Sequence, residues 1–372
     1  IGGLPIGAAP ASVYAADTEQ ALITTSRGTT SYDVVDGGTP TGVVIDPEVL
    51  ILNSPDTANL DAATVMIENF QTGDTLSYTL AAGITAKRNT PDNGVLMFTG
   101  KASAEAYTQT LSSVKFSTTS SDKSVRTIKF TLGDALPYEG NGHFYKYVNK
   151  GSSITWDKAK QEAEGMTYFG RQGYLVTITD AKENEFVKEK TLGLGWIGAQ
   201  DIERKDGGPR KTGDWRWVTG PEGEKDSGNG LKFYEGYYQT SGKPVDGAYT
   251  NWDAQEPNDY SNKEYVAHIF SSGQQAGKWN DYPNDNNVTG YVIEFGGMST
   301  DTNYEVIAEK SVAFVDITEL KKAVEQLDQL KEEDYMEDEW PAYQQALEQA
   351  KTVLENRNKT QEEVNKALEA LK

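Results

Sequence analysis

The chain of 372 residues has no cysteine and only two histidines. The lack of cysteine excludes disulfide bonds, thiolate metal sites and cysteine nucleophiles. No apolar run approaches the roughly 20 residues needed to cross a bilayer, so we expect no membrane insertion within this chain. Basic residues are also scarce, with 35 Lys and Arg against 56 Asp and Glu and a net charge of −21. Because nucleic-acid binding rests on clustered Lys and Arg, this balance argues against a nucleic-acid partner and permits cation binding.

The chain does contain enough apolar sequence for several packed cores, with 37% hydrophobic and 10% aromatic residues. Domains cluster around roughly 100 to 150 residues, so we expect two or three of them. Residues 1–17 are small and apolar, and they resemble the end of a secretory signal, with Val13 and Ala15 at the −3 and −1 positions. The alternative is the flexible N-terminus of a clipped chain.

Residues 18–135 consist of short runs rich in Thr, Ser, Val and Ile, separated by Asp, Asn, Gly and Pro. Val65 and Ile67 alternate with Met66 and Glu68, which is typical of strands in a β-sandwich. The stretches "NLDAATVMIENFQTGDTLSYTLAAGI", "GVLMFTGKASAEAYTQTLSSVKFS" and "RTIKFTLGD" resemble the cadherin-like repeat of large bacterial surface adhesins. That resemblance implies a spacer or adhesive module.

Residues 316–372 change to a period of 3.6, with Leu320, Val324 and Leu327 on one helical face. Thr360 and Glu363 form a capping box that opens the last predicted helix. The pattern predicts a three-helix bundle. It resembles the FIVAR module of cell-wall proteins and secreted carbohydrate-active enzymes.

The middle of the chain, residues 143–297, is rich in Gly and Trp. In "TWDKAKQEA", Trp156 and Ala163 lie on one face of a predicted helix that Ser153 can cap. In "GDWRWVTG", Trp215 and Trp217 point to one face of a predicted strand. Both patterns indicate a packed α+β domain.

A series of motifs in this segment is similar to the C-type lectin-like domain. In order they are "TWDKAKQEA", "GYLVTI", "WIG", "WRWVTG", "NW" before "EPN", "EYVAHI", "WND" and "GYVIEF". The resemblance implies the α+β C-type lectin fold over residues 143–297. We expect residues 298–315 to be a linker to the helical module.

The same resemblance implies a calcium and sugar site. In this family the Glu and Asn of EPN, an acid eight positions after that Glu, and the Asn and Asp of WND hold both the ion and the sugar. In this sequence they are Glu256, Asn258, Glu264, Asn280 and Asp281. Three carboxylates balance a Ca²⁺ and two amides add neutral oxygens, which leaves some of the roughly 6 to 8 ligand positions for sugar hydroxyls.

The order Glu-Pro-Asn implies sugars with equatorial 3- and 4-hydroxyls, namely mannose, glucose and N-acetylglucosamine. We expect Pro257 to be cis, so that its neighbours' side-chain oxygens point to one place. Asp259 would serve a second ion in some relatives, but Tyr265 stands where they have another acid. We therefore expect Asp259 to be solvated surface.

The family's usual disulfide positions are occupied here by other residues, Ala163 with Ile293 and Val266 with Asn284. We expect Ala163 and Ile293 to be buried in contact, because apolar side chains must fill the space of the bridge. The loop carrying Asn284 is expected to be looser.

No motif indicates catalysis, so we do not expect an enzyme. "GLGWIG" lacks the strand-turn-helix context of a dinucleotide site, and neither GxSxG nor HExxH occurs. His143 and His268 are each expected to be hydrogen-bonded structural residues.

The sequence therefore predicts a protein that is secreted or on the surface of a bacterium, of the Gram-positive type. It would bind glycans or glycoproteins of a host or neighbouring cell through Ca²⁺. Three alternatives stay open: an acidic loop that is only solvated surface, a protein-binding adhesin, and the non-catalytic part of a larger glycan-degrading enzyme.

Overall fold

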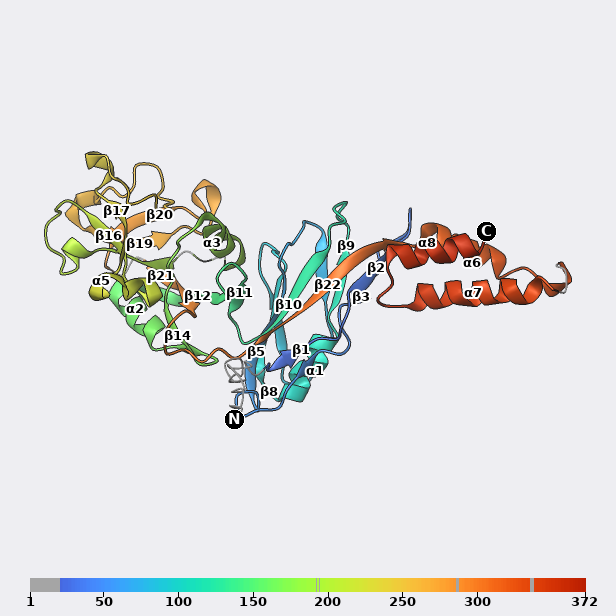
Figure 1. Ribbon diagram of the computed structural model, residues 1–372. Helices are drawn as coiled ribbons and strands as arrows, with labels where there is room; N and C mark the ends of the chain where they lie inside the picture. Colours follow the sequence, from blue (N-terminus) through green and yellow to red (C-terminus); the bar gives the residue numbers. More distant parts are fainter. Residues whose placement is uncertain (1–20, 192, 194, 286–287, 335–337) are drawn as a thin grey trace, which may run out of the picture.

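The computed structural model describes residues 21–191, 193, 195–285, 288–334 and 338–372, and Figure 1 shows them as three bodies in a row. A module of facing sheets lies in the middle, an α+β module on one side and three long helices on the other. The expected signal remnant at residues 1–17 lies outside the described residues.

The central body, which we call the two-sheet module, is built from residues 21–132 and 307–316. Its larger sheet has the order β2 (Thr30–Val34), β22 (Ile307–Asp316), β10 (Arg126–Leu132), β5 (Leu60–Ile67), β8 (Val95–Ala102) and β7 (Thr85–Arg88). Its smaller sheet has the order β3 (Val43–Val44), β9 (Lys115–Thr118) and β6 (Asp74–Ser77). The pair β1 (Ile23–Thr24) and β4 (Leu50–Ile51) and helix α1 (Ala104–Ser112) complete it.

Aromatic rings and one buried ion pair join the two sheets. Tyr32 of the larger sheet meets Phe116 of the smaller one edge to face at 5.4 Å, and Phe314 of β22 lies 5.2 Å from Tyr32. Arg126 Nε lies 2.8 Å from Asp74 Oδ2, and both side chains are fully buried. This pair crosses from β10 to β6, so opposite charges as well as apolar side chains hold the sheets together.

Strand β22 corrects the expected linker at residues 298–315. It lies between β2, to which it is parallel, and β10, to which it is antiparallel, so its residues belong to the core of the larger sheet. Ala308, Val312 and Val315 are buried. A lysine at position 310 does not suggest a buried strand in the sequence. In the structure Lys310 is buried, and its Nζ donates to Ser26 O at 3.0 Å. The α+β module is consequently an insertion between β10 and β22.

The α+β body, which we call the inserted module, runs from β11 to β21. Its strands are β11 (Leu136–Tyr138), β12 (His143–Ile154), β13 (Thr167–Tyr168), β14 (Arg171–Leu175), β15 (Gly195–Asp201), β16 (Asp214–Trp217), β17 (Leu231–Glu235), β18 (Lys243–Pro244), β19 (Glu264–Ile269), β20 (Trp279–Pro283) and β21 (Val288–Phe295). Its helices are α2 (Trp156–Glu164), α3 (Ala181–Phe186), the π-helical turn η1 (Val187–Thr191) and the short α4 (Gly220–Gly223) and α5 (Lys225–Gly228).

The first and last long strands of the inserted module, β12 and β21, pair antiparallel, so the chain enters and leaves on the same side. The tryptophans form the core: Trp217 stacks on Phe233 at 4.6 Å and meets Trp279 at 5.3 Å. Trp215 and Trp217 are both buried, as the strand alternation predicts.

Helix α2 confirms the predicted buried face, with Trp156, Ala159 and Ala163 all buried. Its cap differs from the prediction, because Ser153 belongs to β12 and the Thr155 side chain accepts from Lys158 N.

The residues at the family's usual disulfide positions make other contacts here. Ala163 and Ile293 are fully buried, as predicted. A Cβ on Gly173 would lie 2.6 Å from Ala163 O and 2.7 Å from Ile293 Cδ1, so the two residues approach each other at this glycine. Asn284 takes a separate role, because its Nδ2 donates to Asp157 Oδ2 at 2.6 Å and ties its loop to the start of α2.

The inserted module also packs against the side of the two-sheet module. Met66 of β5 is fully buried in a small cluster with Val95, Leu136 and Phe186. Lys190 of η1 reaches across and donates to Ile67 O at 3.0 Å and Asn93 O at 2.9 Å. The simple alternation expected for β5 fails at Met66 because another module covers its outer face.

Helices α6 (Thr318–Leu327), α7 (Trp340–Glu355) and α8 (Gln361–Ala370) share one apolar core with the end of β22. The predicted capping box at Thr360 and Glu363 is present. The turn between α7 and α8 contacts β2, where Lys359 Nζ lies 2.7 Å from Asp33 Oδ1. The helices are therefore joined to the two-sheet module by more than the chain connection.

Candidate metal centre

The candidate site lies where the loop before β19 folds over the antiparallel pair β19 and β20. Glu256, Asn258 and Asp259 come from this loop, Glu264 begins β19, and Asp281 lies in the middle of β20. The loop is held in place by Asp253, whose backbone N donates to Trp279 O at 2.8 Å.

Three carboxylates converge here, as the motif spacing predicts. Glu256, Glu264 and Asp281 each place one oxygen within 4.8 Å of the others. Glu264 is 6% exposed and Asp281 is fully buried, while Glu256 is half-buried. None of these three acids forms an ion pair with Lys, Arg or His of the described chain. Three clustered carboxylates, two of them buried and one half-buried, need either protons or a metal ion when no protein cation pairs with them.

Backbone amides orient the carboxylates. Asp281 accepts from the N–H groups of Asn258 at 3.0 Å and Asp259 at 2.7 Å, and Glu264 accepts from Tyr260 N at 3.0 Å. The Asn258 side-chain amide donates to Glu256 Oε1 at 2.9 Å. The peptide bond between Glu256 and Pro257 is cis, as predicted.

Three oxygen atoms of the loop are buried without a hydrogen-bond partner: Glu256 Oε2, Asn258 Oδ1 and Asp259 Oδ2. The last lies 3.7 Å from Arg210 Nε, whereas Glu256 Oε2 and Asn258 Oδ1 have no cation of the described chain in an ion pair with them. Leaving a buried acceptor unsatisfied costs about 1 to 3 kcal/mol, and more for a charged group, so such atoms are rare. An oxygen-seeking cation would satisfy Glu256 Oε2 and Asn258 Oδ1 and balance the carboxylates at once. These residues therefore fit Ca²⁺, which prefers carboxylate and amide oxygens.

The pKa values of the three carboxyl groups agree with a cation site. Burial, assisted by the neighbouring Asp281 and Glu264, raises the pKa of Glu256 to about 9. Burial and the charge of Asp281 raise the pKa of Glu264 to about 8. The pKa of Asp281 is also raised, by burial against the opposing effect of its hydrogen bonds. Without a cation, the site holds protons at neutral pH.

Asn280 differs from the other predicted ligands. Within the described chain, its side chain makes no recorded contact with any of them. Its Nδ2 lies 3.1 Å from His268 Nε2, and the two residues are directly opposed on β20 and β19. Burial lowers the pKa of His268 to about 4, so the ring is neutral and accepts this hydrogen bond. The role of Asn280 as a ligand stays a prediction. His143 is hydrogen-bonded as expected, with Nδ1 2.6 Å from Glu294 Oε1.

Asp259 corrects the expectation of solvated surface. It is 3% exposed, and its Oδ1 lies 2.5 Å from Nη1 of the buried Arg204. Arg204 also donates to Asn262 O at 2.7 Å and Glu264 O at 3.2 Å, so it supports the whole loop from beneath. The sequence could not show this ion pair, because Arg204 and Asp259 are 55 positions apart and no motif contains both residues.

The loop carries unusual backbone strain. Gln255, Asp259, Ser261 and Asn262 all have positive φ, with values of 66°, 49°, 58° and 55°. Each such residue costs of order 1 to 3 kcal/mol and persists only where its surroundings hold it, most often at ligand sites. The Arg204 contacts with Asp259 and with Asn262 O provide that restraint in the second half of the loop.

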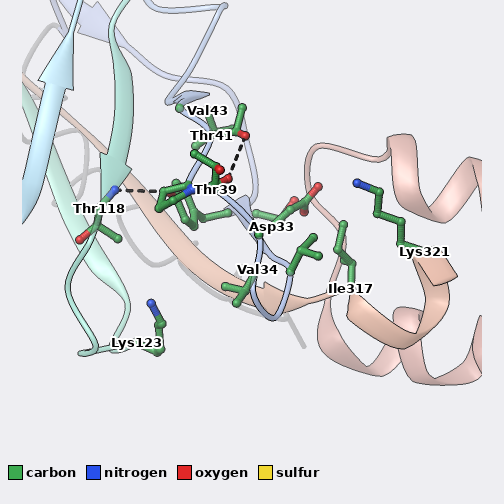
Figure 2. A pocket seen from close by; sticks show the side chains of 15 residues that line it. Asp33, Val34, Thr39, Thr41, Val43, Thr118, Lys123, Ile317 and Lys321 are labelled. Carbon is green, nitrogen blue, oxygen red and sulfur yellow. Dashed lines mark hydrogen bonds between the residues drawn. The ribbon is translucent and has the colours of Figure 1, made fainter.

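Two hollows in the surface are relevant. One of about 370 Å³ includes Asn258 and Asp259 in its lining, so it shares Asn258 with the candidate site. The other, of about 520 Å³, lies between the two-sheet module and the helices, where Figure 2 shows Asp33, Ile317 and Lys321 around it. The Asp33 carboxylate there is already paired with Lys359, so this second hollow offers no comparable set of free oxygens.

Comparisons with known proteins match different shares of this chain. The FIVAR domain family matches residues 316–372. Halomucin of Haloquadratum walsbyi is 32% identical over 332 residues, which cover 84% of this chain but 3% of halomucin. The hepatic lectin of Gallus gallus is 26% identical over 145 residues, covering 39% of this chain and 50% of that lectin. The chain thus spans a small part of the first relative and half of the second.

Among solved structures, the cow C-type carbohydrate-recognition domain of CD23, determined in the presence of a GlcNAc2Man3 oligosaccharide, is 19% identical with a TM-score of 0.30. It matches 45% of this chain and 99% of that one. The FIVAR family model thus matches the helical end of the chain, and its neighbours in the sequence and structure comparisons include C-type lectins. None of the helices in the described ranges is long and apolar enough to cross a membrane.

Proposed function

We propose that the inserted module binds sugars through a Ca²⁺ held by Glu256, Glu264 and Asp281, with the oxygen of Asn258 as a further ligand. The observation that carries this proposal is the pair of buried, unpartnered oxygens, Glu256 Oε2 and Asn258 Oδ1, beside three converging carboxylates. Asn280 completes the set in the family pattern.

The ion would neutralise the carboxylates and leave coordination positions for two neighbouring sugar hydroxyls. Glu256 Oε1 now accepts from Asn258 Nδ2 at 2.9 Å. A sugar hydroxyl placed between them would donate to Glu256 and accept from Asn258, so it would replace that bond with two. This order of acceptor and donor supports sugars of the mannose, glucose and N-acetylglucosamine type.

The two-sheet module and the helices would act as a spacer that presents the inserted module, the first as a cadherin-like repeat and the second as the FIVAR module. Their docking contacts through Lys190 and Lys359 would keep the three bodies in a fixed order. The protein would be secreted or displayed on a cell surface, where glycans of a host or neighbouring cell are its partners, and it would have no catalytic activity. A bacterial source of the Gram-positive type remains the expectation from the sequence.

The test is a calorimetric titration of the full chain with methyl α-mannoside, in calcium and in EDTA. We expect binding at roughly millimolar Kd in calcium only, because few atoms are engaged. Glu264→Gln should abolish it, whereas Glu224→Gln, an equal charge change on an exposed side chain of the same module, should not. Calcium binding without any sugar binding would favour the protein-adhesin alternative.

Sugar class has its own test. Glu256→Gln combined with Asn258→Asp reverses which side chain donates and which accepts, so galactose should be preferred over mannose. A preference for galactose in the unaltered chain would overturn the assignment.

A further inference from the structure

The hollow of about 370 Å³ is lined by one basic residue, Arg210, by the acid Asp259 and otherwise by uncharged side chains. Asn258 lines it and also belongs to the candidate metal centre, so a ligand at the centre would border the hollow. The other residues that matter are Arg210, Tyr238 and Tyr260.

Arg210 brings a positive charge that the protein leaves partly unmatched. One oxygen of Asp259 lies 2.5 Å from Arg204, and the other lies 3.7 Å from Arg210. Two guanidinium groups therefore share one carboxylate. Within the described ranges Arg210 makes no hydrogen bond, and its guanidinium lies 5.4 Å from the centre of the Tyr237 ring. A guanidinium with free, planar donors is suited to a carboxylate or a sulfate.

Arg210 is 32% exposed, so a ligand in the hollow can reach it. Its loop, residues 205–211, carries Lys205, Arg210 and Lys211 against the single acid Asp206. A local basic loop on a chain of net charge −21 would attract an anion to this edge in particular.

Tyr238 and Tyr260 supply apolar surface. They are 53% and 73% exposed, and Tyr260 is the most exposed large hydrophobic residue of the described chain. Exposed tyrosines combine a flat apolar face with a polar tip, which suits contact with the faces of sugar rings. A few polar groups among such faces are typical of ligand sites.

We propose that this hollow is a second sugar subsite that takes an acidic residue, with a carboxylate or sulfate ester on Arg210, linked to the sugar at the metal centre. The inference rests on the proposed function, because the neighbouring sugar would be held through calcium. It makes the natural ligand an anionic glycan rather than a neutral one.

The experiment uses matched disaccharides that differ only in the charged group, titrated into the full chain with calcium at about 0.15 M salt. Glucuronosyl-mannose carries the carboxylate, glucosyl-mannose is its neutral counterpart, and the 6-sulfated form of the latter carries the ester. We expect at least one of the two anions to bind about tenfold more tightly than the neutral disaccharide, as for a charge-assisted contact that water partly screens. Which of them does so identifies the anionic group.

Arg210→Gln should reduce this ratio to about one and leave the binding of methyl α-mannoside unchanged. Lys211→Gln removes the same charge from an exposed side chain outside the hollow and should preserve the ratio. Tyr260→Ala should weaken the acidic and neutral disaccharides alike.

A ratio of one in the unaltered chain, a ratio that Arg210→Gln leaves intact, or an equal loss in Lys211→Gln would overturn the subsite. If methyl α-mannoside still binds in calcium, the proposed function survives that result. Acidic binding that persists in EDTA and is lost in Arg210→Gln would support the subsite and refute calcium dependence. Failure of every sugar to bind would overturn both.

Discussion

Calcium binding to the inserted module should release protons, because the site is protonated when no cation is present. Burial and neighbouring acids hold the pKa of Glu256 at about 9 and that of Glu264 at about 8. At pH 7 both values lie above the pH, so each group keeps a proton in the calcium-free protein. Calcium needs ionised carboxylates and must displace these protons.

The magnitude follows from the number of protons released. Glu256 and Glu264 can together release up to two protons at pH 7, and water around the half-buried Glu256 lowers their expected contribution to about one to two. Each proton released makes the apparent Kd tenfold smaller for every pH unit gained. From pH 6 to pH 7 calcium should therefore bind about 10- to 100-fold more tightly, and the dependence should level off above about pH 9.

The assay is calorimetry of calcium binding in two buffers with different ionisation enthalpies, which yields the number of protons directly. Glu264→Gln should bind calcium more weakly and release fewer protons. Glu224→Gln should behave as the unaltered chain, because that side chain is exposed and outside the site. Calcium affinity that does not change between pH 6 and pH 8, or full affinity in Glu264→Gln, would refute the reasoning.

Three further predictions concern stability and folding. In EDTA the free energy of unfolding of the inserted module should fall as the pH rises from about 5 to 9. Over this range Glu256 holds a proton in the folded state, whereas in the unfolded state its pKa returns to its ordinary value and the proton is lost. Urea melts should show the trend, and calcium should remove it. Arg204→Met leaves Asp259 buried without its closest partner, so urea denaturation should show that the free energy of unfolding falls by about 3 kcal/mol. Lys205→Met is the exposed control, and an equal fall there would contradict the assignment. A fragment of residues 21–135 should not fold alone, since it lacks β22. Joining residues 307–316 to it through a short linker should restore strand signals in circular dichroism. A stable fragment without β22 would contradict the topology.

Local patterns in the sequence were sufficient for individual elements. The buried face of α2, the Thr360 capping box and the shared face of Trp215 and Trp217 all follow from periodicity and side-chain chemistry within a few residues. The convergence of Glu256, Glu264 and Asp281 was also predictable, but through motif spacing in a resembled family. Periodicity alone would not have found it.

The tertiary structure decided what depends on partners distant in the chain. Residues 307–316 look like a polar linker until β2 and β10 lie on either side of them, where the buried Lys310 donates to the carbonyl oxygen of Ser26. Met66 was expected on an outer face and is buried only because the inserted module covers it.

At the site, the sequence by itself, through the motif spacing of a resembled family, predicted that Glu256, Glu264 and Asp281 meet. Only the tertiary structure decided the charge around them. Asp259 is neutralised by Arg204, and Arg210 is left facing the neighbouring hollow. The physical reason is that a buried charge takes whichever partner the fold brings within a few ångströms, and sequence distance carries no information about that choice.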